Sequence, residues 1–390
     1  MTHEGPLEVL LLGASGVFGS RLARLACEED GIHLTLAARG LAKVETLAAE
    51  MPGDQACVAL NRDTLTAHDL AGFDVVVDAA GPFQSSHSRV IESAIAARTD
   101  YIDLADGREF VRNFPRYDEV AKGAEVALTT GASSIPALSH AVLDNLTRNW
   151  RSIESIRIGI YPGNRAPRGL SVVEAILSYV GHPVRVFMDG EWQKVPGWGF
   201  THREDLPGIG KRWAGVCDTP EQDLLVERYK PTKSAEFYAG LELSILHLGL
   251  AALALPVRWG WVKSMRSIAR PMLAAAQWFL PFGSDRGGMS VRVKGADGDG
   301  RLADRRWFLN ADANRGPNVP TLAALAMLRR YRDGERPAPG ARVCSGMLTL
   351  DDFSADFSRL GIMQQTYDEK LAPIAVREAS ALAPRGEAWQ

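Results

Sequence analysis

The order of apolar and polar positions divides the chain into two parts with different periodicity. Over about the first 140 residues, short apolar runs alternate with segments whose apolar side chains recur at helical spacing. The runs expected to form strands, with their exit turns, are 7–12, 32–39, 56–60, 73–83, 99–107 and 126–131. Helical patterns separate them, including 41–51, 88–97 and, after the sixth strand, 138–150. This alternation predicts an α/β fold with a doubly wound parallel sheet.

Beyond Trp150 the pattern changes to paired strands with tight turns. Asp189-Gly190 separates the expected strands 184–188 and 191–195, and this dipeptide favours a two-residue hairpin turn. A second hairpin is expected between 289–293 and 305–311. Its acidic connection is interpreted as a turn rather than a calcium loop, because Arg301 occupies a position that would need an oxygen ligand. These hairpins predict a second, α+β domain built on a mixed or antiparallel sheet.

An apolar insert at about 239–280 lies between the two hairpins. Its first part, to Trp261, is rich in leucine, and its second part, 262–280, is expected to form a helix with basic residues. Polar residues and a proline interrupt the first part, so it does not predict a membrane span. Helices that cover a substrate pocket or a partner subunit are the favoured interpretation, with a homodimer expected. A peripheral membrane contact is the less favoured alternative.

Composition and charge are those of an ordinary globular protein. The 390 residues carry a formal net charge of −3, which gives no reason to expect nucleic acid as a partner. The four cysteines are far apart, which predicts reduced thiols and no metal site. The first six residues lack the basic and apolar regions of a signal peptide, so a cytoplasmic location is expected.

Three glycines spaced three apart follow the first predicted strand and precede the first predicted helix. Gly13 allows a tight turn, Gly16 allows close approach of a pyrophosphate, and Gly19 allows the helix to lie close to the sheet. The N-terminus of the helix then offers free N–H groups to the phosphates. The predicted dinucleotide-binding residues in this turn are Gly13, Ala14, Ser15, Gly16, Val17, Phe18 and Gly19.

The second strand ends in Arg39, with Lys43 one helical turn later. An acidic residue at this point would hold the adenosine ribose of NAD, whereas two cations suit the 2′-phosphate of NADP. The cofactor is therefore expected to be NADP (NADPH). Small residues at the end of the fourth strand are expected to pass close to its ribose and nicotinamide, namely Ala79, Ala80, Gly81, Pro82 and Phe83.

These features divide the chain into three expected regions. Residues 1–143 form a dinucleotide-binding Rossmann domain, and residues 144–316 form the substrate and dimerisation domain with its apolar insert. Residues 317–390 form a C-terminal segment that returns to the Rossmann domain.

Five sequence blocks in this order resemble the saccharopine dehydrogenase-like oxidoreductases. They are the glycine turn 13–19, Ala38-Arg39, 78–83, Tyr101-Ile-Asp-Leu104 and 131–136, with further similarity at 315–320 and 344–350. The resemblance implies a nicotinamide-dependent enzyme that reduces or forms a C=N bond. Family members tend to carry a Gly-Phe-Asp-Ser-Ile-Pro turn, but this chain has Ala132 and Ser133 in place of Phe-Asp. This turn therefore lacks the carboxylate that family members carry there.

Candidate proton donors lie at the strand exits that would face the nicotinamide. They are Tyr101, Asp103, Asp106 and His140, with His87 as a further candidate. Arg89, Arg108 and Arg112 are candidates for holding a substrate carboxylate. Tyr229 and Lys233 have the spacing of a short-chain dehydrogenase motif, but Pro231 would break the helix that this motif needs, so the match is interpreted as chance.

The expected function is hydride transfer to or from a C=N bond of a small molecule, which can be apolar. An enoyl or carbonyl reductase acting on a lipid-like or biosynthetic intermediate is the first alternative. A non-catalytic dinucleotide-binding or membrane-associated scaffold is the second.

Overall fold

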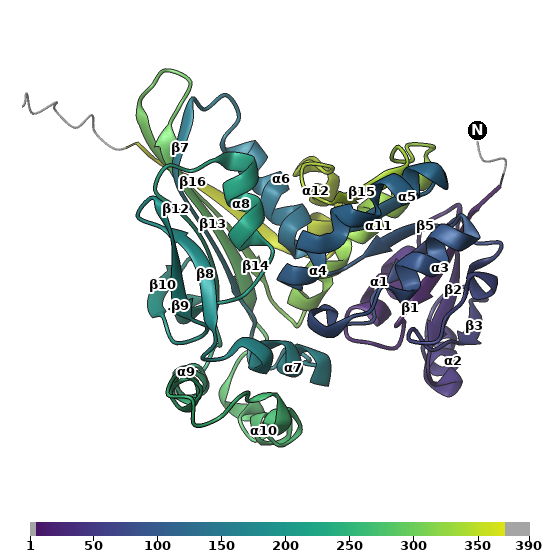
Figure 1. Ribbon diagram of the computed structural model, residues 1–390, viewed down its shortest axis with the longest axis horizontal. Coiled ribbons are helices and arrows are strands. Elements are labelled where there is room, and N and C mark those ends of the chain that lie inside the picture. Colours follow the sequence, from purple (N-terminus) through teal and green to yellow (C-terminus); the bar gives the residue numbers. More distant parts are fainter. Residues whose placement is uncertain (1–4, 371–390) are drawn as a thin grey trace, which may run out of the picture.

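The computed structural model describes residues 5–370, which form two β-sheets with helices packed around them (Figure 1). Residues 1–4, part of the segment from which the absence of a signal peptide is predicted, lie outside the described residues. The first sheet is parallel and the second is mixed.

The parallel sheet contains seven strands in the order β15-β6-β5-β4-β1-β2-β3. Its strands are β1 (Leu7–Leu12), β2 (Ile32–Ala38), β3 (Ala56–Ala59), β4 (Val75–Asp78), β5 (Asp100–Asp103), β6 (Ala127–Thr130) and β15 (Gly340–Val343). The order reverses direction at β1, so the crevice beside its carboxyl end is where open α/β sheets bind ligands. The six strands expected from the N-terminal pattern are confirmed, while β15 carries too short an apolar run to be recognised.

Helices cover both faces of the parallel sheet, because its strands alternate between two apolar cores. Val9 and Leu11 of β1 pack in one core, and Leu10 and Leu12 pack in the other. The first core includes α1 (Gly19–Ala26), α2 (Leu41–Ala49), α6 (Ser139–Leu146) and α11 (Val319–Arg332), whereas the second includes α3 (Arg89–Ala97) and α5 (Asp118–Gly123). The helix α4 (Arg108–Asn113) follows β5.

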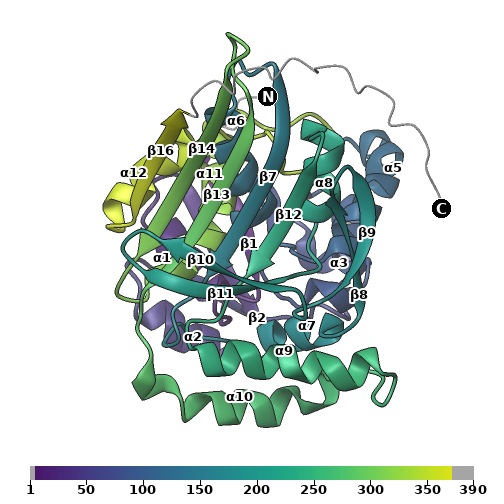
Figure 2. The same ribbon diagram turned by 90° about the vertical axis from the view of Figure 1, so that its left-hand side faces the viewer.

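The mixed sheet has the path β10-β11-β12-β7-β13-β14-β16, with β8 and β9 attached beside β12 (Figure 2). Its strands are β7 (Ser152–Tyr161), β8 (Pro183–Met188), β9 (Glu191–Pro196), β10 (Thr201–Leu206), β11 (Gly210–Val216), β12 (Ser234–Ala239), β13 (Gly287–Ala296), β14 (Leu302–Ala311) and β16 (Met363–Lys370). Only the pairing of β12 with β7 is parallel among the described residues. The sheet is therefore mixed, as expected.

Both predicted hairpins are confirmed, β8–β9 and β13–β14. The connection of the second is a turn, in which Asp297 Oδ1 accepts hydrogen bonds from the backbone N–H groups of Asp299 and Arg301. The hairpin β10–β11 was not predicted, since its strands are polar and lack clear alternation. The C-terminal segment contributes β15 to the parallel sheet and β16 to the mixed sheet.

Two helices differ from the sequence pattern. The helix expected over 262–280 begins only at residue 269, as α10 (Ala269–Gln277). The reason is Pro271, which lacks an N–H group and fits only in the first turn of a helix. Near the C-terminus, the sequence from Leu348 onward predicts a short strand followed by a helix, but in the structure the helix α12 (Asp351–Arg359) comes first and the strand β16 follows it. Thr349 starts this helix, since its backbone N–H and its hydroxyl both donate to Asp352.

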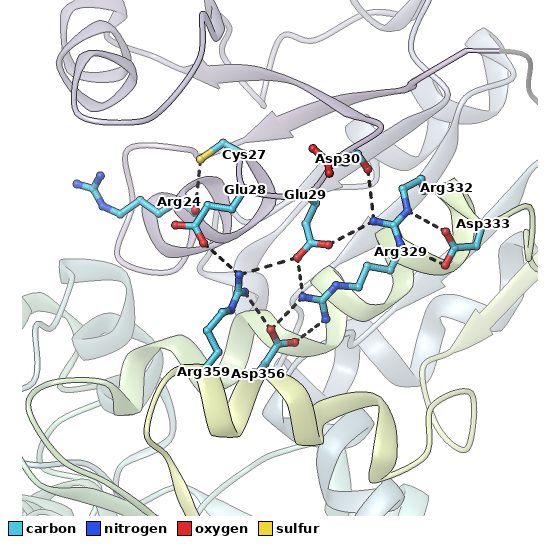
Figure 3. Close-up of polar contacts among 10 residues, drawn as sticks. All are labelled: Arg24, Cys27, Glu28, Glu29, Asp30, Arg329, Arg332, Asp333, Asp356 and Arg359. Atoms are coloured by element: carbon cyan, nitrogen blue, oxygen red, sulfur yellow. Dashed lines mark hydrogen bonds and ion pairs between the residues drawn. The ribbon is translucent and has the colours of Figure 1, made fainter.

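An ionic network ties α11 and α12 to the loop between α1 and β2 (Figure 3). Arg329 donates to both carboxylate oxygens of Asp356, at 2.6 and 2.9 Å, and to Glu29 at 2.6 Å. Arg332 and Arg359 also pair with Glu29. The network connects residues more than 300 positions apart, so it fixes the C-terminal segment against the glycine-turn helix.

The helices α9 (Ser244–Arg258) and α10 lie together at one end of the molecule, away from the β13–β14 turn (Figures 1 and 2). The helix α7 (Leu170–Tyr179) lies beside α10, and α8 (Glu221–Tyr229) packs against β12. Among residues 5–370, no helix combines the length and the apolar character that crossing a membrane requires.

Candidate functional site

The glycine turn has the close packing expected of a dinucleotide site. Gly13 has a φ of +74° and lies so close to Ala80 that an added Cβ would come within 2.9 Å of it. A Cβ on Gly19 would overlap the carbonyl oxygen of Gly13, so only glycine lets α1 approach the turn this closely. The backbone N–H groups of Ser15, Val17 and Phe18 have no acceptor within residues 5–370, and they are available to an anion.

Arg39 and Lys43 lie beyond the end of β2, and both side chains are exposed. Neither has an ion-pair partner in the part of the chain that the structure describes. Both cations are therefore free to meet a phosphate group, which fits the interpretation of this strand end as the ribose side of the site.

The exit of β4 is held by a buried ion pair. Asp78 is fully buried and accepts a hydrogen bond from the backbone N–H of Ala80 through Oδ1. Its other oxygen accepts from Nε of Arg62 at 2.8 Å, and Arg62 also donates to Ser86 at 2.6 Å. The Arg62 guanidinium lies 5.0 Å from the ring centre of Phe83. Through Asp78, Ser86 and Phe83, Arg62 therefore fixes the position of the predicted cofactor loop, residues 79–83.

Asp103 repeats this arrangement at the neighbouring strand, where it lies opposite Asp78 in the register of β4 and β5. Its Oδ1 accepts from the backbone N–H groups of Ala105 and Gly131 and from the hydroxyl of Thr130, at 2.8 to 2.9 Å. Burial raises the pKa of the Asp103 carboxyl to about 7, against the lowering effect of these donors. Asp103 thus orders the exits of both β5 and β6.

The other candidates on β5 and α6 are also buried. Tyr101 packs against Phe114, and burial together with the nearby Asp103 raises the pKa of its hydroxyl well above the usual value. The Nδ1 atom of His140 lies 2.5 Å from the hydroxyl oxygen of Ser345, and burial lowers the pKa of the imidazole to about 3. His140 is therefore neutral at physiological pH, and both residues are surrounded by protein.

Asp106 differs from these candidates, because its side chain is exposed and accepts a hydrogen bond from Gln84 at 3.1 Å. Desolvation by the surrounding protein raises its pKa. Burial raises the pKa values of Tyr179, at the end of α7, and of Glu221, at the start of α8, and the negative charge of Asp106 adds a smaller effect in the same direction. The end of α7 and the start of α8 therefore lie near this carboxyl, which follows β5.

Glu221 is the most perturbed acid at this junction. It is fully buried, and its Oε1 accepts a hydrogen bond from the Ser139 hydroxyl at 2.6 Å, while Oε2 has no partner within the described residues. Burial raises the pKa of Glu221 to about 8, so the carboxyl carries a proton at neutral pH. Ser139 begins α6, which follows β6, so this protonated carboxyl lies on the side of the parallel sheet where its strands end, and a carboxyl in this state can act as a general acid.

The candidate arginines have different environments. Arg108 is buried and forms a bidentate pair with Asp223, a second pair with Asp218 and a hydrogen bond to the carbonyl of Arg185. It links the two parts of the chain, and four of its five N–H donors are already used in these bonds, so it is engaged as a structural residue. Arg89 and Arg112 are exposed, as is His87. Arg112 lines a cavity of about 420 Å³ together with Arg108, Val111, Pro115, Pro220, Asp223, Leu224, Glu227, Arg228, Val343 and Ser345.

Two residues of the site were not singled out in the sequence. Arg62 lies in a short polar loop after β3, and Glu221 lies in the second half of the chain, 115 residues beyond Asp106. Neither belongs to a motif, and only the tertiary structure brings them to the strand exits. The rejected Tyr229–Lys233 motif is confirmed as chance, because α8 ends at Tyr229 and Lys230 adopts a left-handed conformation before Pro231.

Comparison with known proteins gives a sequence match for the N-terminal part of the chain and structural matches for nearly all of it. Residues 9–145 match the family described as the saccharopine dehydrogenase NADP binding domain. Saccharopine dehydrogenase (L-Glu forming) from Saccharomyces cerevisiae has a similar structure, with a TM-score of 0.66 and 15% identity over 93% of this chain and 99% of the yeast chain. Homospermidine synthase from Legionella pneumophila, solved with NAD, has a TM-score of 0.58 and 12% identity over 96% of this chain and 94% of its own. No curated protein sequence matches the chain.

Proposed function

We propose that this chain, whose residues 9–145 match the saccharopine dehydrogenase NADP binding domain, is an NADP-dependent oxidoreductase of the saccharopine dehydrogenase-like family, acting on the C=N bond of an imine or on the corresponding secondary amine. The observation that carries the proposal is the junction around Asp106. There the hydroxyl of Ser139, at the start of the helix that follows β6, donates at 2.6 Å to the buried carboxyl of Glu221 in α8. Burial raises the pKa of this carboxyl to about 8, and the charge of Asp106 at the exit of β5 adds to the shift.

The residues for the cofactor fit a dinucleotide phosphate. The glycine turn offers unpaired backbone N–H groups to the pyrophosphate, and Arg39 and Lys43 would hold a 2′-phosphate. The loop 79–83, supported by Asp78 and Arg62, would lie against the ribose and the nicotinamide. When bound, the nicotinamide supplies or accepts the hydride, and the protein orients it.

The proton in our proposal comes from Glu221. An imine draws hydride more strongly when its nitrogen is protonated, and the Glu221 carboxyl holds a proton up to about pH 8. Asp106 favours this protonated state, because its charge opposes a second negative charge nearby. Asp103 is assigned to positioning the strand exits, because its Oδ1 accepts three hydrogen bonds from the exits of β5 and β6. Tyr101 and His140 are assigned to positioning β5 and α6, because burial raises the pKa of the Tyr101 hydroxyl well above its usual value and lowers the pKa of His140 to about 3, so neither gives up a proton at neutral pH.

Fluorescence titration with NADPH and NADH tests the cofactor. We expect the protein to bind NADPH more tightly than NADH. Arg39→Asp should lower the affinity for NADPH by about tenfold or more and leave the affinity for NADH little changed. Arg98→Asp, an exposed cation at the end of α3, is the matched control and should alter neither affinity. If Arg39→Asp weakens the binding of both cofactors equally, the proposed role of Arg39 is wrong. If the original protein binds neither cofactor, the proposal that it is a nicotinamide-dependent enzyme is wrong.

The pH dependence of imine reduction tests the acid. Activity should fall as the pH rises through about 8, because Glu221 then loses its proton. Glu221→Gln should remove this alkaline limb and lower kcat by about a hundredfold or more. Ser139→Ala should move the limb to higher pH, since the Ser139 hydrogen bond lowers the pKa of Glu221. If the fall in activity at alkaline pH is the same in Glu221→Gln as in the original protein, a group other than Glu221 donates the proton.

A second candidate reaction is reduction of a C=C or C=O bond in a lipid-like molecule. The exposed apolar helices α9 and α10 beside α7 favour an apolar substrate. A panel of secondary amines, imines, enoyl compounds and ketones with NADPH consumption as the readout distinguishes the two. Turnover of only the carbon–carbon or carbonyl compounds would replace the proposed reaction while leaving the cofactor assignment intact.

A further inference from the structure

Exposed apolar side chains gather at the end of the molecule formed by α9 and α10 (Figures 1 and 2). Of the sixteen large hydrophobic side chains that are exposed within residues 5–370, nine lie in this segment. They are Ile245, Leu248, Leu255, Trp259, Trp261, Val262, Trp278, Leu280 and Phe282, and we call this set the α9–α10 face. Exposed apolar groups scattered singly are ordinary, whereas such a concentration indicates a binding surface.

The helix α9 has apolar residues on both of its sides. His247, Leu250 and Ala254 face inward and are buried. Ile245, Leu248 and Leu255 recur at helical spacing on the other side, where a surface helix normally carries polar residues. The pattern therefore gives α9 a second apolar stripe that no described residue covers.

The turn after α9 presents aromatic rings to solvent. Trp259 and Trp261 contact each other with ring centres 4.8 Å apart, and Gly260 between them has a φ of +74°. Trp261 is 75% exposed, and Trp278 at the end of α10 is 80% exposed. Tryptophan favours the boundary between water and lipid, because one end of its ring system is apolar and the other carries an N–H donor.

The charges of this region have a single sign. Residues 243–284 contain four basic residues and no Asp or Glu, in a chain whose net charge is −3. Arg258, Lys263 and Arg270 are exposed and have no ion-pair partner within residues 5–370. Arg165, which donates to the carbonyls of residues 280 and 281, adds a further exposed cation.

The acidic side chains near this face either already pair with other residues or are half-buried. Glu174 of α7 lies 3.9 Å from Arg266, and Glu242 binds Arg212 and Ser284. Asp285 is half-buried after the end of the segment. The basic residues around the α9–α10 face therefore give this end of the molecule a net positive charge.

We propose that the α9–α10 face binds the surface of an anionic lipid membrane. Apolar and aromatic side chains would enter the boundary between headgroups and acyl chains, while the surrounding cations meet the anionic headgroups. A second copy of the chain fits this face less well, because an isologous contact would bring its unpaired cations toward those of the partner. The proposal does not depend on the reaction that the enzyme performs.

Vesicle sedimentation of the full chain tests the proposal directly. We expect the protein to sediment with vesicles of phosphatidylcholine mixed with phosphatidylglycerol, and to bind vesicles of phosphatidylcholine alone much less. Raising the salt concentration should weaken the binding, since screening reduces the attraction between exposed cations and headgroups. Tryptophan fluorescence should shift to the blue on binding as the exposed rings leave water.

Two variants separate the apolar part from the charge. Trp261→Ser combined with Trp278→Ser and Phe282→Ser should lower the partition coefficient by about tenfold or more. Lys263→Ala combined with Arg270→Ala should lower it by about fivefold for each cation removed, on anionic vesicles only. Arg301→Ala, in the β13–β14 turn at the opposite end of the molecule, removes one cation, as Lys263→Ala alone does; it is the control for a single lost charge and should bind like the original protein.

Each remaining outcome overturns the proposal. Failure of the unchanged protein to sediment with anionic vesicles rejects the membrane surface. Equal binding by the variants and the original protein rejects this face as its site. If the protein is a dimer by light scattering, the tryptophan variant is a monomer and neither binds vesicles, the α9–α10 face is instead a contact between two copies. Cofactor titration of every variant verifies that the fold is intact.

Discussion

Arginine and aromatic residues occur together in two regions of this molecule, with opposite surroundings. At the carboxyl end of the parallel sheet, Arg62 lies beside Phe83, donates to Asp78 and Ser86, and is almost enclosed by protein. On the α9–α10 face, Arg258 and Lys263 lie beside exposed tryptophans and have no ion-pair partner within the described residues. The same residue types thus stabilise the protein in one region and remain available to a partner in the other.

The difference shows how pairing separates the two roles. A buried charge must have a partner, because removal from water costs several kcal/mol, and its bonds then hold the surrounding backbone in place. An exposed cation without a partner contributes little to folding. Variants in the first region should therefore change stability, and variants in the second should change only binding.

Replacement of Arg62 should have the largest effect. Arg62→Met leaves Asp78 buried without its cation, so we expect a loss of about 3–5 kcal/mol in the free energy of unfolding, measured by chemical denaturation. The double variant Arg62→Met with Asp78→Asn should recover part of this loss, because the unpaired charge is removed. A loss below about 1 kcal/mol in the single variant would contradict the role of the pair.

Asp103 should make stability depend on pH. Its pKa is about 7 in the folded protein and about 4 in an unfolded chain, so the unfolded state loses its proton first as the pH rises. Stability from this group is therefore present at pH 4 and is lost between pH 4 and 7. In Asp103→Asn this decline should be smaller by about 2–4 kcal/mol, measured by urea denaturation across this range. Identical pH profiles would contradict the raised pKa.

Glu29 should show a smaller effect of opposite sign. The hydrogen bond from Arg329 lowers the pKa of Glu29, so its contribution is present at neutral pH and is lost as the pH falls through the folded pKa (Figure 3). Glu29→Gln should cost about 1 kcal/mol at pH 7 and progressively less in acid. Glu50→Gln, which removes an exposed pair with Arg24, is the control and should cost less than about 0.5 kcal/mol. Equal losses in the two variants would remove the distinction between the network and an ordinary surface pair.

Substitutions on the α9–α10 face should have the smallest effect on folding. Trp261→Ser and Lys263→Ala each replace an exposed side chain, so we expect changes within about 0.5 kcal/mol by chemical denaturation. A loss above about 2 kcal/mol would show that the face supports the fold, and the comparison between the two regions would then fail.

The glycine turn shows how far sequence reasoning extends in this chain. A strand, a turn and a helix that are adjacent in sequence form by local rules, so Gly13, Gly16 and Gly19 predict the turn that the structure contains. The strand exits with Asp78, Asp103 and Asp106 were also predicted, because parallel strands end at the same edge of the sheet. The chemical environment of each acid was not predicted, since burial depends on residues elsewhere in the chain.

Local sequence therefore determined the alternating strands and helices, the tight turns, the dinucleotide-binding frame and the presence of an apolar, basic insert. Tertiary structure decided that Arg62 supports the loop after β4, that Arg108 is occupied by Asp223 and that Glu221 lies near Asp106. It also packed one side of the α9–α10 insert on the core and left the other side exposed. The physical reason is that helix, strand and turn preferences act over a few residues, whereas burial and charge pairing depend on segments that meet only after folding.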